Sequence, residues 1–257
     1  MTDVEETVVE PPLEVELKYR MTDAGPGERL LAADDLAGFT ASGPVVLVVN
    51  EDRYLDTDDG RLAGAGYACR LRSTPDGTII SLKGLRGIGG GGEVHRREEL
   101  EGPADPAVAP TDWPASDARD RVVEIAGDSA LGDLVSVRQA RRKREYEHDG
   151  TIVELSVDDV EVVAGGAVIE RFAELELELR AGDEAALESL ADLLSEIEEL
   201  VPAETSKLER ALDAVRRAEI TEIADATVEP DVAGEAAGEA AGRRDSRPAG
   251  LVWPGRM

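Results

Sequence analysis

Apolar and charged residues alternate in two stretches that lie far apart in the chain. From Leu13 to Arg20 every second residue is apolar, and the stretch 168–180 ends with the same alternation. A period of two residues is typical of a β-strand with one buried face. The charged faces carry Glu14, Glu16 and Lys18 in the first stretch and Glu174, Glu176 and Glu178 in the second. We therefore predict two strands, each with an apolar face and a charged face.

The two-residue period recurs between these stretches. It predicts further strands at 45–57, 66–73, 78–83, 94–101, 134–147 and 151–161, separated by turn sequences such as Pro75-Asp76-Gly77. Apolar patterns of longer period predict helices at 28–38, 117–126, 183–200 and 207–219. Eight strands joined mostly by hairpins, with helices beside them, indicate an α+β fold built on an antiparallel sheet.

We expect one domain over 13–219, flanked by segments that do not order themselves. Residues 1–12 form an acidic lead, and 220–257 are rich in Ala, Gly and Glu with few bulky apolar residues. The glycine-rich stretch 84–92 could cradle a phosphate, but a strand pattern follows it where a cradle needs a helix. We therefore interpret it as a flexible hairpin connection.

The chain is strongly acidic, which limits its partners. Of 257 residues, 56 are Asp or Glu and 28 are Lys or Arg, a formal net charge of −28. Such a field repels nucleic-acid phosphates and anionic lipids, so we expect neither nucleic acid nor a membrane as partner. The acidity by itself also suits simple solubility or high salt. With no signal peptide pattern, no apolar run near the roughly 20 residues of a membrane span, and a single cysteine, Cys69, we expect a cytoplasmic protein; a homodimer stays open.

Like charges gather strand by strand, which is unusual for a mixed protein surface. Eight antiparallel strands can close into a barrel wide enough to hold a small ligand. If the charged faces look inward, the bases inside are Lys18, Arg70, Arg72, Lys83, Arg97, Arg142 and Arg144. The acids inside are Glu14, Glu16, Glu99, Glu101, Glu154, Asp158, Glu174, Glu176 and Glu178. The alternative is that these residues form solvated outer faces paired across strands.

A charged interior is costly to desolvate, which favours a ligand of matching charge. Arg and Lys suit the oxygens of a phosphorylated anion, whereas carboxylates suit Mg²⁺ or Mn²⁺, which bridge them to phosphates. Together they predict a polyphosphate site with a divalent metal. Lys143 has the opposite parity to Arg142 and Arg144. Either it is exposed, or a bulge re-aims it, or the register of the strand is shifted by one residue.

Eight short motifs, in order along the chain, resemble those of the CYTH, or triphosphate tunnel metalloenzyme, superfamily. The first, Glu14-Val-Glu16-Leu-Lys18, is similar to its ExExK signature. The others are Tyr54-Leu-Asp56-Thr57, Arg70-Leu-Arg72, Ser81-Leu-Lys83, Arg97-Glu-Glu99-Leu-Glu101, Arg142-Lys-Arg144-Glu-Tyr146, the acidic strands with Glu154, Asp158 and Glu174-Leu-Glu176-Leu-Glu178, and Ser206-Lys207 with Arg210. Each motif is weak alone, but their order over most of the chain is specific.

The resemblance implies an eight-stranded tunnel that binds triphosphate compounds together with Mg²⁺ or Mn²⁺. It implies phosphate binding by Lys18, Arg70, Arg72, Lys83, Arg97, Arg142, Arg144 and Lys207. It implies metal binding by Glu14, Glu16, Asp158, Glu174, Glu176 and Glu178, and we add the inward acids Glu99, Glu101 and Glu154 as metal candidates. A metal-oriented water would attack the terminal phosphorus. The expected catalytic residues are Glu16, Glu176 and Lys83, the last of which would position or deprotonate that water.

The main functional hypothesis is hydrolysis of inorganic triphosphate or a short polyphosphate. Tyr54 and Tyr146 are the only candidates for stacking a base. Because a nucleotide needs such groups, a class IV adenylate cyclase is kept as an alternative, together with a thiamine triphosphatase. A non-catalytic polyphosphate-binding module is an alternative from another class. It ranks lower because a protein that only binds an anion would not need the full set of acidic residues.

Overall fold

The structure is a computed structural model that describes residues 12–87 and 94–227, with side chains described as far as residue 220. Residues 1–11 of the predicted acidic lead, most of the predicted tail 220–257 and most of the glycine-rich connection lie outside these residues. The strands are β1 (Leu13–Met21), β2 (Asp35–Leu36), β3 (Phe39–Ala41), β4 (Val46–Thr57), β5 (Tyr67–Thr74), β6 (Gly77–Gly84), β7 (Val94–Ala104), β8 (Leu131–His148), β9 (Thr151–Ala164), β10 (Ala167–Ala181) and β11 (Leu200–Pro202). The helices are α1 (Gly25–Ala32), α2 (Arg61–Gly64), α3 (Asp117–Ala126), α4 (Ala186–Ser195) and α5 (Lys207–Thr227), with a 3₁₀ turn at Pro110–Asp112.

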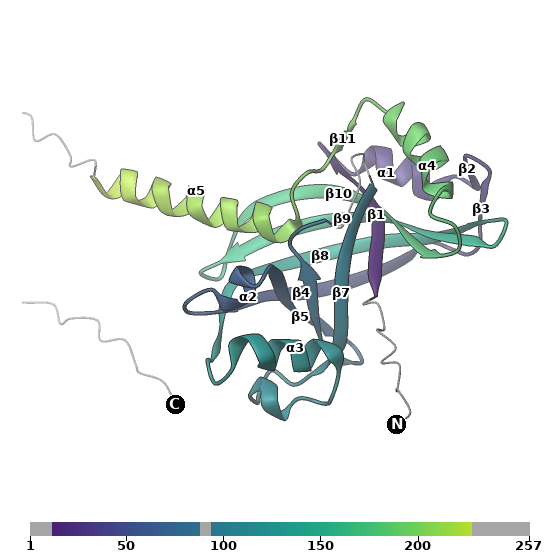
Figure 1. Ribbon diagram of the computed structural model, residues 1–257. Coiled ribbons are helices and arrows are strands. Elements are labelled where there is room, and N and C mark those ends of the chain that lie inside the picture. The colour runs from purple at the N-terminus through teal and green to yellow at the C-terminus, as the bar shows by residue number, and fades with distance from the viewer. Residues whose placement is uncertain (1–11, 88–93, 228–257) are drawn as a thin grey trace, which may run out of the picture.

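Eight of the described strands close into an antiparallel barrel, which confirms the predicted fold (Figure 1). They neighbour one another in the order β4-β5-β6-β7-β1-β10-β9-β8, and the pairing of β8 with β4 completes the ring. The short strands β2, β3 and β11 extend the sheet at its margins. The alternating strand near the N-terminus therefore lies beside the acidic strand β10, with Lys18 opposite Glu176.

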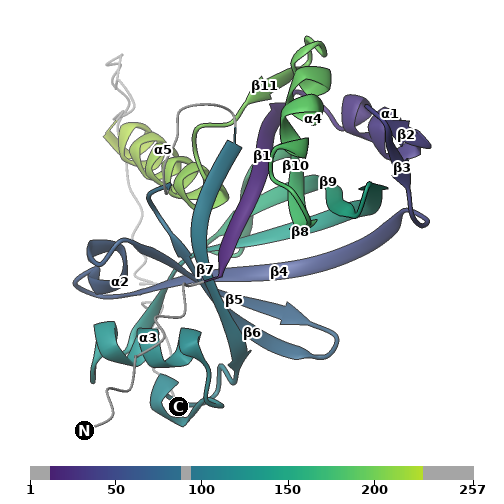
Figure 2. The same ribbon diagram turned by 45° about the vertical axis from the view of Figure 1, so that its right-hand side comes forward.

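Helices cover the apolar outer face of the barrel in two places (Figure 2). Leucines of α1 and α4 pack over β1, β9 and β10, and apolar residues of α2 and α3 pack over β5, β6 and β7. Helix α1 lies so close to β9 that a Cβ atom at Gly27 would meet Cγ2 of Val157 at 2.4 Å. Because the apolar faces are buried against helices from outside, the charged faces look inward.

One end of the barrel interior is apolar, and helix α5 begins there. Leu208 and Ala211 of α5 pack against inward residues such as Val137 on β8 and Phe172 on β10. From this packing site α5 runs outward, away from the barrel (Figure 1). The inner face of a single strand is thus apolar beside α5 and charged farther along the strand.

Helix α3 spans the predicted residues 117–126, whereas the other three predicted helices differ in their ends. Helix α1 ends at Ala32, where the chain turns into β2, and α4 ends at Ser195 before β11. Helix α5 continues to Thr227, past the predicted end at residue 219. Within the described residues, no helix combines the length and the apolar character needed to cross a bilayer.

Candidate active site

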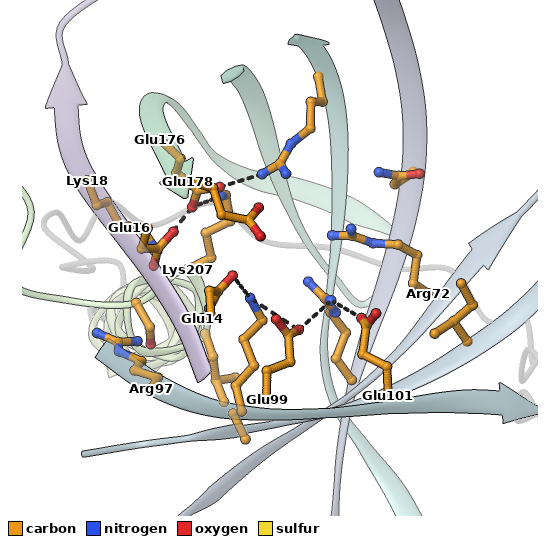
Figure 3. A pocket seen from close by; sticks show the side chains of 18 of the residues that line it. Glu14, Glu16, Lys18, Arg72, Arg97, Glu99, Glu101, Glu176, Glu178 and Lys207 are labelled. Atoms are coloured by element: carbon orange, nitrogen blue, oxygen red, sulfur yellow. Dashed lines mark hydrogen bonds and ion pairs between the residues drawn. The ribbon is translucent and has the colours of Figure 1, made fainter. Parts of the chain in front are cut away.

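The barrel encloses a charged cavity of about 340 Å³, a size that suits a small ligand (Figure 3). The basic lining residues are Lys18, Arg70, Arg72, Lys83, Arg97, Arg141, Lys143, Arg180 and Lys207. The acidic lining residues are Glu14, Glu16, Glu99, Glu101, Glu154, Glu176 and Glu178. Nine bases on one cavity, in a chain whose net charge is −28, indicate a site for an anion.

Glu176 lies at the centre of one group of contacts in this cavity. Its carboxylate is 3.0 Å from Nζ of Lys18 and 2.6 Å from Nζ of Lys207. Arg141 donates a hydrogen bond to the other oxygen of the same carboxylate. Lys18 also lies 3.1 Å from Glu16. One carboxylate therefore joins β1, β8 and α5 to β10 inside the barrel.

These contacts keep the buried groups charged. Burial by itself would raise the pKa of Glu176, but Lys18, Lys207 and Arg141 outweigh it, and this pKa lies well below its ordinary value. Burial would lower the pKa of Lys18, yet Glu16 and Glu176 hold it well above the ordinary lysine value. The pKa of Lys207 is raised in the same way, because nearby carboxylates outweigh its burial. Both lysines are therefore available as cations for an anionic ligand at neutral pH.

Asp52 organises a second group of contacts, although it is not among the site residues predicted from the sequence. Arg72 donates two hydrogen bonds to its carboxylate, at 2.7 and 2.8 Å, and Arg70 lies 3.8 Å away. Asp52 is completely buried. Burial would raise its pKa, but Arg72 and Arg70 lower it below the ordinary value. The position of Asp52 two residues before Tyr54, on the same face of β4, is the signal that could have revealed it.

Lys83, on β6, contacts carboxylates from two other strands. Its Nζ lies 2.6 Å from Oε1 of Glu14 and 3.3 Å from Oε1 of Glu99. Burial would lower the pKa of Lys83, but these two glutamates raise it above the ordinary lysine value. A lysine that stays protonated can bind a phosphate or orient a water, whereas it cannot accept the proton of that water. The raised pKa thus argues against the proton-accepting half of the predicted role.

Arg97 completes the predicted basic residues that reach the cavity. It lies on β7 opposite Glu14 of β1. Its Nε is buried and has no hydrogen-bond partner among the described residues. Nε of Arg70 is in the same state. Unsatisfied buried donors are costly, so both groups suit a ligand that accepts hydrogen bonds.

Arg142 and Arg144 do not line the cavity, so the predicted register of β8 is wrong by one residue. Arg142 contacts Glu28 and Asp159 at the surface of the molecule. Arg144 donates to backbone carbonyls, among them those of Leu31 and Gly43. The inward positions belong to Arg141 and Lys143, and Nζ of Lys143 lies 2.7 Å from Glu154.

The reason for this error lies farther back on β8. Val135 and Val137 share the inward parity of Arg141 and pack with α5. The prediction places apolar residues outside and charged residues inside, so it places these valines outside. Because side chains alternate along a strand, the remaining residues of β8 are then assigned to the wrong face as well. Only the position of α5 shows that an apolar residue belongs inside at this end.

The predicted acidic residues fall into two groups. Seven line the cavity: Glu14, Glu16, Glu99, Glu101, Glu154, Glu176 and Glu178. Asp158 and Glu174 are buried beside Lys207, at 2.9 and 3.2 Å from its Nζ. These two act as counter-charges for the lysine and do not border the cavity.

The carboxylates on β1 and β10 fit a divalent cation. Glu16 lies opposite Glu178 on paired strands, and Glu14 precedes Glu16 on the same face. Oε2 of Glu14 is buried without a hydrogen-bond partner, and Mg²⁺ and Mn²⁺ prefer such oxygens. In the part of the chain that the structure describes, no three acidic, His or Cys groups already form a metal cluster. The carboxylates form ion pairs with Lys18, Lys83 and Arg180 instead. They therefore suit a cation that binds together with an anion, because the anion can take over the bases.

Two further predicted residues serve the structure of the barrel. Tyr146 is buried in the outer core, where its hydroxyl donates to the carbonyl oxygen of Leu30 at 2.9 Å. Asp56 accepts hydrogen bonds from the backbone N–H groups of Leu62 and Ala63 and so holds the start of α2. Because Tyr146 lies outside the cavity, Tyr54 is the one aromatic residue among the described lining residues.

Comparison with known proteins agrees with this architecture. HpAC1 from Hippeastrum, described as an adenylyl cyclase candidate with a dominant triphosphatase activity, is 23% identical with a TM-score of 0.54, over 80% of this chain and 96% of that one. An adenylate cyclase candidate from Bacillus halodurans is 18% identical with a TM-score of 0.48, over 77% and 97%. The CYTH domain family model matches residues 12–212, which is most of the sequence. The chain therefore belongs to the CYTH domain family.

Proposed function

We propose that this protein is a divalent-metal-dependent hydrolase that removes the terminal phosphate of a triphosphate, chiefly inorganic triphosphate or a short polyphosphate. The observation that carries the proposal is the lining of the cavity, where nine bases meet seven carboxylates. A ligand that satisfies the bases has to carry several negative charges, and one that satisfies the carboxylates has to bring positive charge. A triphosphate with Mg²⁺ or Mn²⁺ meets both conditions.

The bases would bind and orient the chain of phosphates. Arg70 and Arg72, positioned by Asp52, present planar donor groups that match phosphate oxygens. Lys18 and Lys207 add point charges beside Glu176. Because these groups are held in place before the reaction, they can stabilise the charge that develops on the equatorial oxygens of the transferred group.

Glu14, Glu16 and Glu178 are the residues that we expect to hold the cation. When bound, Mg²⁺ or Mn²⁺ would neutralise phosphate charge and acidify a coordinated water. Lys83 stays protonated and would orient that water or a terminal phosphate oxygen. Glu176 would act by keeping Lys18 and Lys207 aimed at the ligand. We also propose a cytoplasmic location, which suits a chain whose single cysteine is buried and free.

A nucleotide is a less suitable ligand because base-stacking groups are scarce. Tyr54 is the one aromatic residue among the described lining residues, and it is 6% exposed. The second candidate is a class IV adenylate cyclase, since the description of the Hippeastrum protein names both activities. A thiamine triphosphatase and a non-catalytic polyphosphate-binding module follow. The binding module is disfavoured because seven carboxylates would weaken a cavity that only binds anions.

Phosphate release from a substrate panel tests the proposal. The panel consists of inorganic triphosphate, a longer polyphosphate, thiamine triphosphate and ATP, each with Mg²⁺ or Mn²⁺. We expect inorganic triphosphate to be cleaved fastest. Formation of cyclic AMP from ATP would indicate a cyclase, and tight triphosphate binding without release of phosphate would indicate a binding module.

Two variants test the inward assignment of the acidic residues. Glu16→Gln and Glu176→Gln should each abolish turnover while circular dichroism shows a preserved fold. Glu147→Gln, which changes an exposed glutamate on β8, is the matched control and should behave like the wild type. A near-normal rate in either cavity variant would contradict the proposed site.

A further inference from the structure

The first five residues of β4 form an open edge of the sheet. On one side Val46–Asn50 pairs with β8. On the other side β5 begins to pair only at Glu51, opposite Ser73, and no other described strand takes its place. Figure 2 shows β4 running on past the end of the β5–β6 hairpin. The backbone groups that point to this side can therefore pair with an added strand.

The side chains at this edge are apolar and exposed. Leu47 and Val49 are 63% and 68% exposed, and Val45 and Val46 are 44% and 46% exposed. Proteins usually protect an open edge with an inward charge, a bulge or a proline within the strand. The run from Val45 to Val49 has none of these charges or prolines. An open edge with exposed apolar side chains, four of the five β-branched, favours pairing with a further strand.

We propose that this strand is the same edge of a second copy of the chain. The segment Val45-Val46-Leu47-Val48-Val49 reads identically in both directions. In an antiparallel pair centred on Leu47, Val45 would face Val49 of the second copy. Every side chain of the segment then meets an apolar residue. The pair has twofold symmetry and joins the two barrels in the order β8-β4-β4-β8.

A second copy is favoured over another partner because it supplies an edge in the same state. Its Val46–Asn50 backbone is open on the same side, and its Val45–Val49 side chains are apolar as well, so one antiparallel pair with twofold symmetry covers both edges at once. The palindrome adds that each valine of one copy then faces a valine of the other. Leu251-Val252-Trp253 near the C-terminus is an apolar alternative within the chain, without this symmetry.

The dimer is expected to be weak and to strengthen with salt. Pairing of so short a segment buries less than the roughly 1,200 Å² of a standard interface. Each copy also carries a net charge of −28, so the two repel one another. Salt screens this repulsion over about 10 Å or less, whereas apolar contacts and backbone hydrogen bonds do not need low salt. An interface held by ion pairs would show the opposite dependence.

Sedimentation equilibrium of the full chain tests the proposal, over a range from about 1 µM to about 500 µM. We expect a monomer–dimer equilibrium whose dissociation constant falls as salt rises. Leu47→Lys brings two like charges together at the axis and should weaken the dimer by about tenfold or more. Leu47→Glu should do the same, and an equimolar mixture of the two variants should restore association. Ile220→Lys, at a residue of α5 that is 67% exposed, is the matched control.

A cysteine at the axis tests the register. Cys69 is buried, so Leu47→Cys supplies an exposed thiol to an otherwise unreactive chain. Oxidation should give a covalent dimer, because facing residues of paired strands have Cβ atoms about 5 Å apart, whereas Ile220→Cys should not. A chain that stays monomeric throughout, or a dimer that Leu47→Lys leaves intact, overturns the proposal. Protection, in a dilute monomer, of those Val46–Asn50 amides that point away from β8 would also overturn it, in favour of Leu251-Val252-Trp253.

Discussion

Arg141 donates two hydrogen bonds, at 2.7 and 2.6 Å, to the two carboxylate oxygens of Asp158 on the neighbouring strand. Asp158 is completely buried, and its carboxylate also lies 2.9 Å from Nζ of Lys207. Burial would raise the pKa of Asp158, but Arg141 and Lys207 lower it. One carboxylate beneath the cavity wall therefore fixes the direction of two cations that line the cavity.

Replacing Arg141 should impair catalysis far more than replacing its neighbour in the sequence. We expect Arg141→Ala to lower kcat/KM for triphosphate by about 10²-fold or more, because a pre-aimed cation is lost from the cavity. Arg142→Ala, which removes a residue that contacts Glu28 and Asp159 outside the cavity, should stay close to the wild type. Steady-state kinetics of both variants check this expectation. Equal losses in the two variants would mean that the inward face of β8 has been assigned wrongly.

Arg144→Ala should affect stability and leave substrate binding unchanged. Arg144 donates to the carbonyl oxygens of Leu31, Ala33 and Gly43, and so ties the end of α1 to β8. Its loss removes three hydrogen bonds from a charged donor to part-buried carbonyl oxygens, which should lower the free energy of unfolding by about 1–3 kcal/mol. Urea denaturation measures this change, and KM for triphosphate serves as the control. A raised KM with unchanged stability would place Arg144 in the binding site after all.

Triphosphate and metal should bind cooperatively, because bases now hold the carboxylates that a cation needs. Lys83 lies 2.6 Å from Glu14, and Lys18 lies 3.1 Å from Glu16. An anion that draws these lysines away frees the glutamates. We therefore expect triphosphate to tighten Mn²⁺ binding by about fivefold or more, and Mn²⁺ to tighten triphosphate binding by the same factor. Electron paramagnetic resonance of free Mn²⁺ measures the first of these effects.

A lysine variant provides the control for this coupling. Lys83→Met removes the partner of Glu14, so Mn²⁺ should bind this variant more tightly than the wild type when triphosphate is absent. Arg142→Ala, which leaves the cavity intact, should show the wild-type coupling. Mn²⁺ affinity that is the same with and without triphosphate would contradict the exchange of partners.

Glu176 and Glu178 should have opposite effects on stability as the pH changes. The pKa of Glu176 is lowered, so its contribution is present above the unfolded value of about 4.3 and is lost as the pH falls through the folded pKa. The pKa of Glu178 is raised, mainly because burial and nearby Glu14 outweigh Arg180. Its contribution is present below about 4.3 and is lost as the pH rises through the folded pKa.

Thermal unfolding of two glutamine variants between acidic and neutral pH measures these effects. At neutral pH we expect Glu176→Gln to lower Tm and Glu178→Gln to raise it. The Tm difference between Glu178→Gln and the wild type should disappear in acid, where the native glutamate is protonated as well. A lowered Tm for Glu178→Gln at neutral pH would show that this carboxylate is stabilised as an anion.

Most of the barrel could be predicted from the alternation of residues, because charged residues keep one parity along β1 and along the part of β10 from Glu174 to Arg180. The exception is β8, where Val137 and Arg141 share the inner face. Local pattern assigns them to opposite faces, and only the packing of α5 resolves the conflict. Asp52 escaped prediction for a related reason: its partners Arg70 and Arg72 come from the next strand, so its role depends on the pairing of β4 with β5.

The ion pairs inside the cavity set a threshold for what can enter. Lys18, Lys83 and Lys207 each hold a carboxylate partner, so a ligand has to displace several contacts at the same time. Three linked phosphates can do so, because the second and third contacts form within one molecule, whereas a single phosphate cannot. Cleavage would leave two shorter anions, each holding fewer bases, and the carboxylates would regain their partners. The same ion pairs would then select ligands that carry several negative charges and, by forming again after cleavage, favour release of the products.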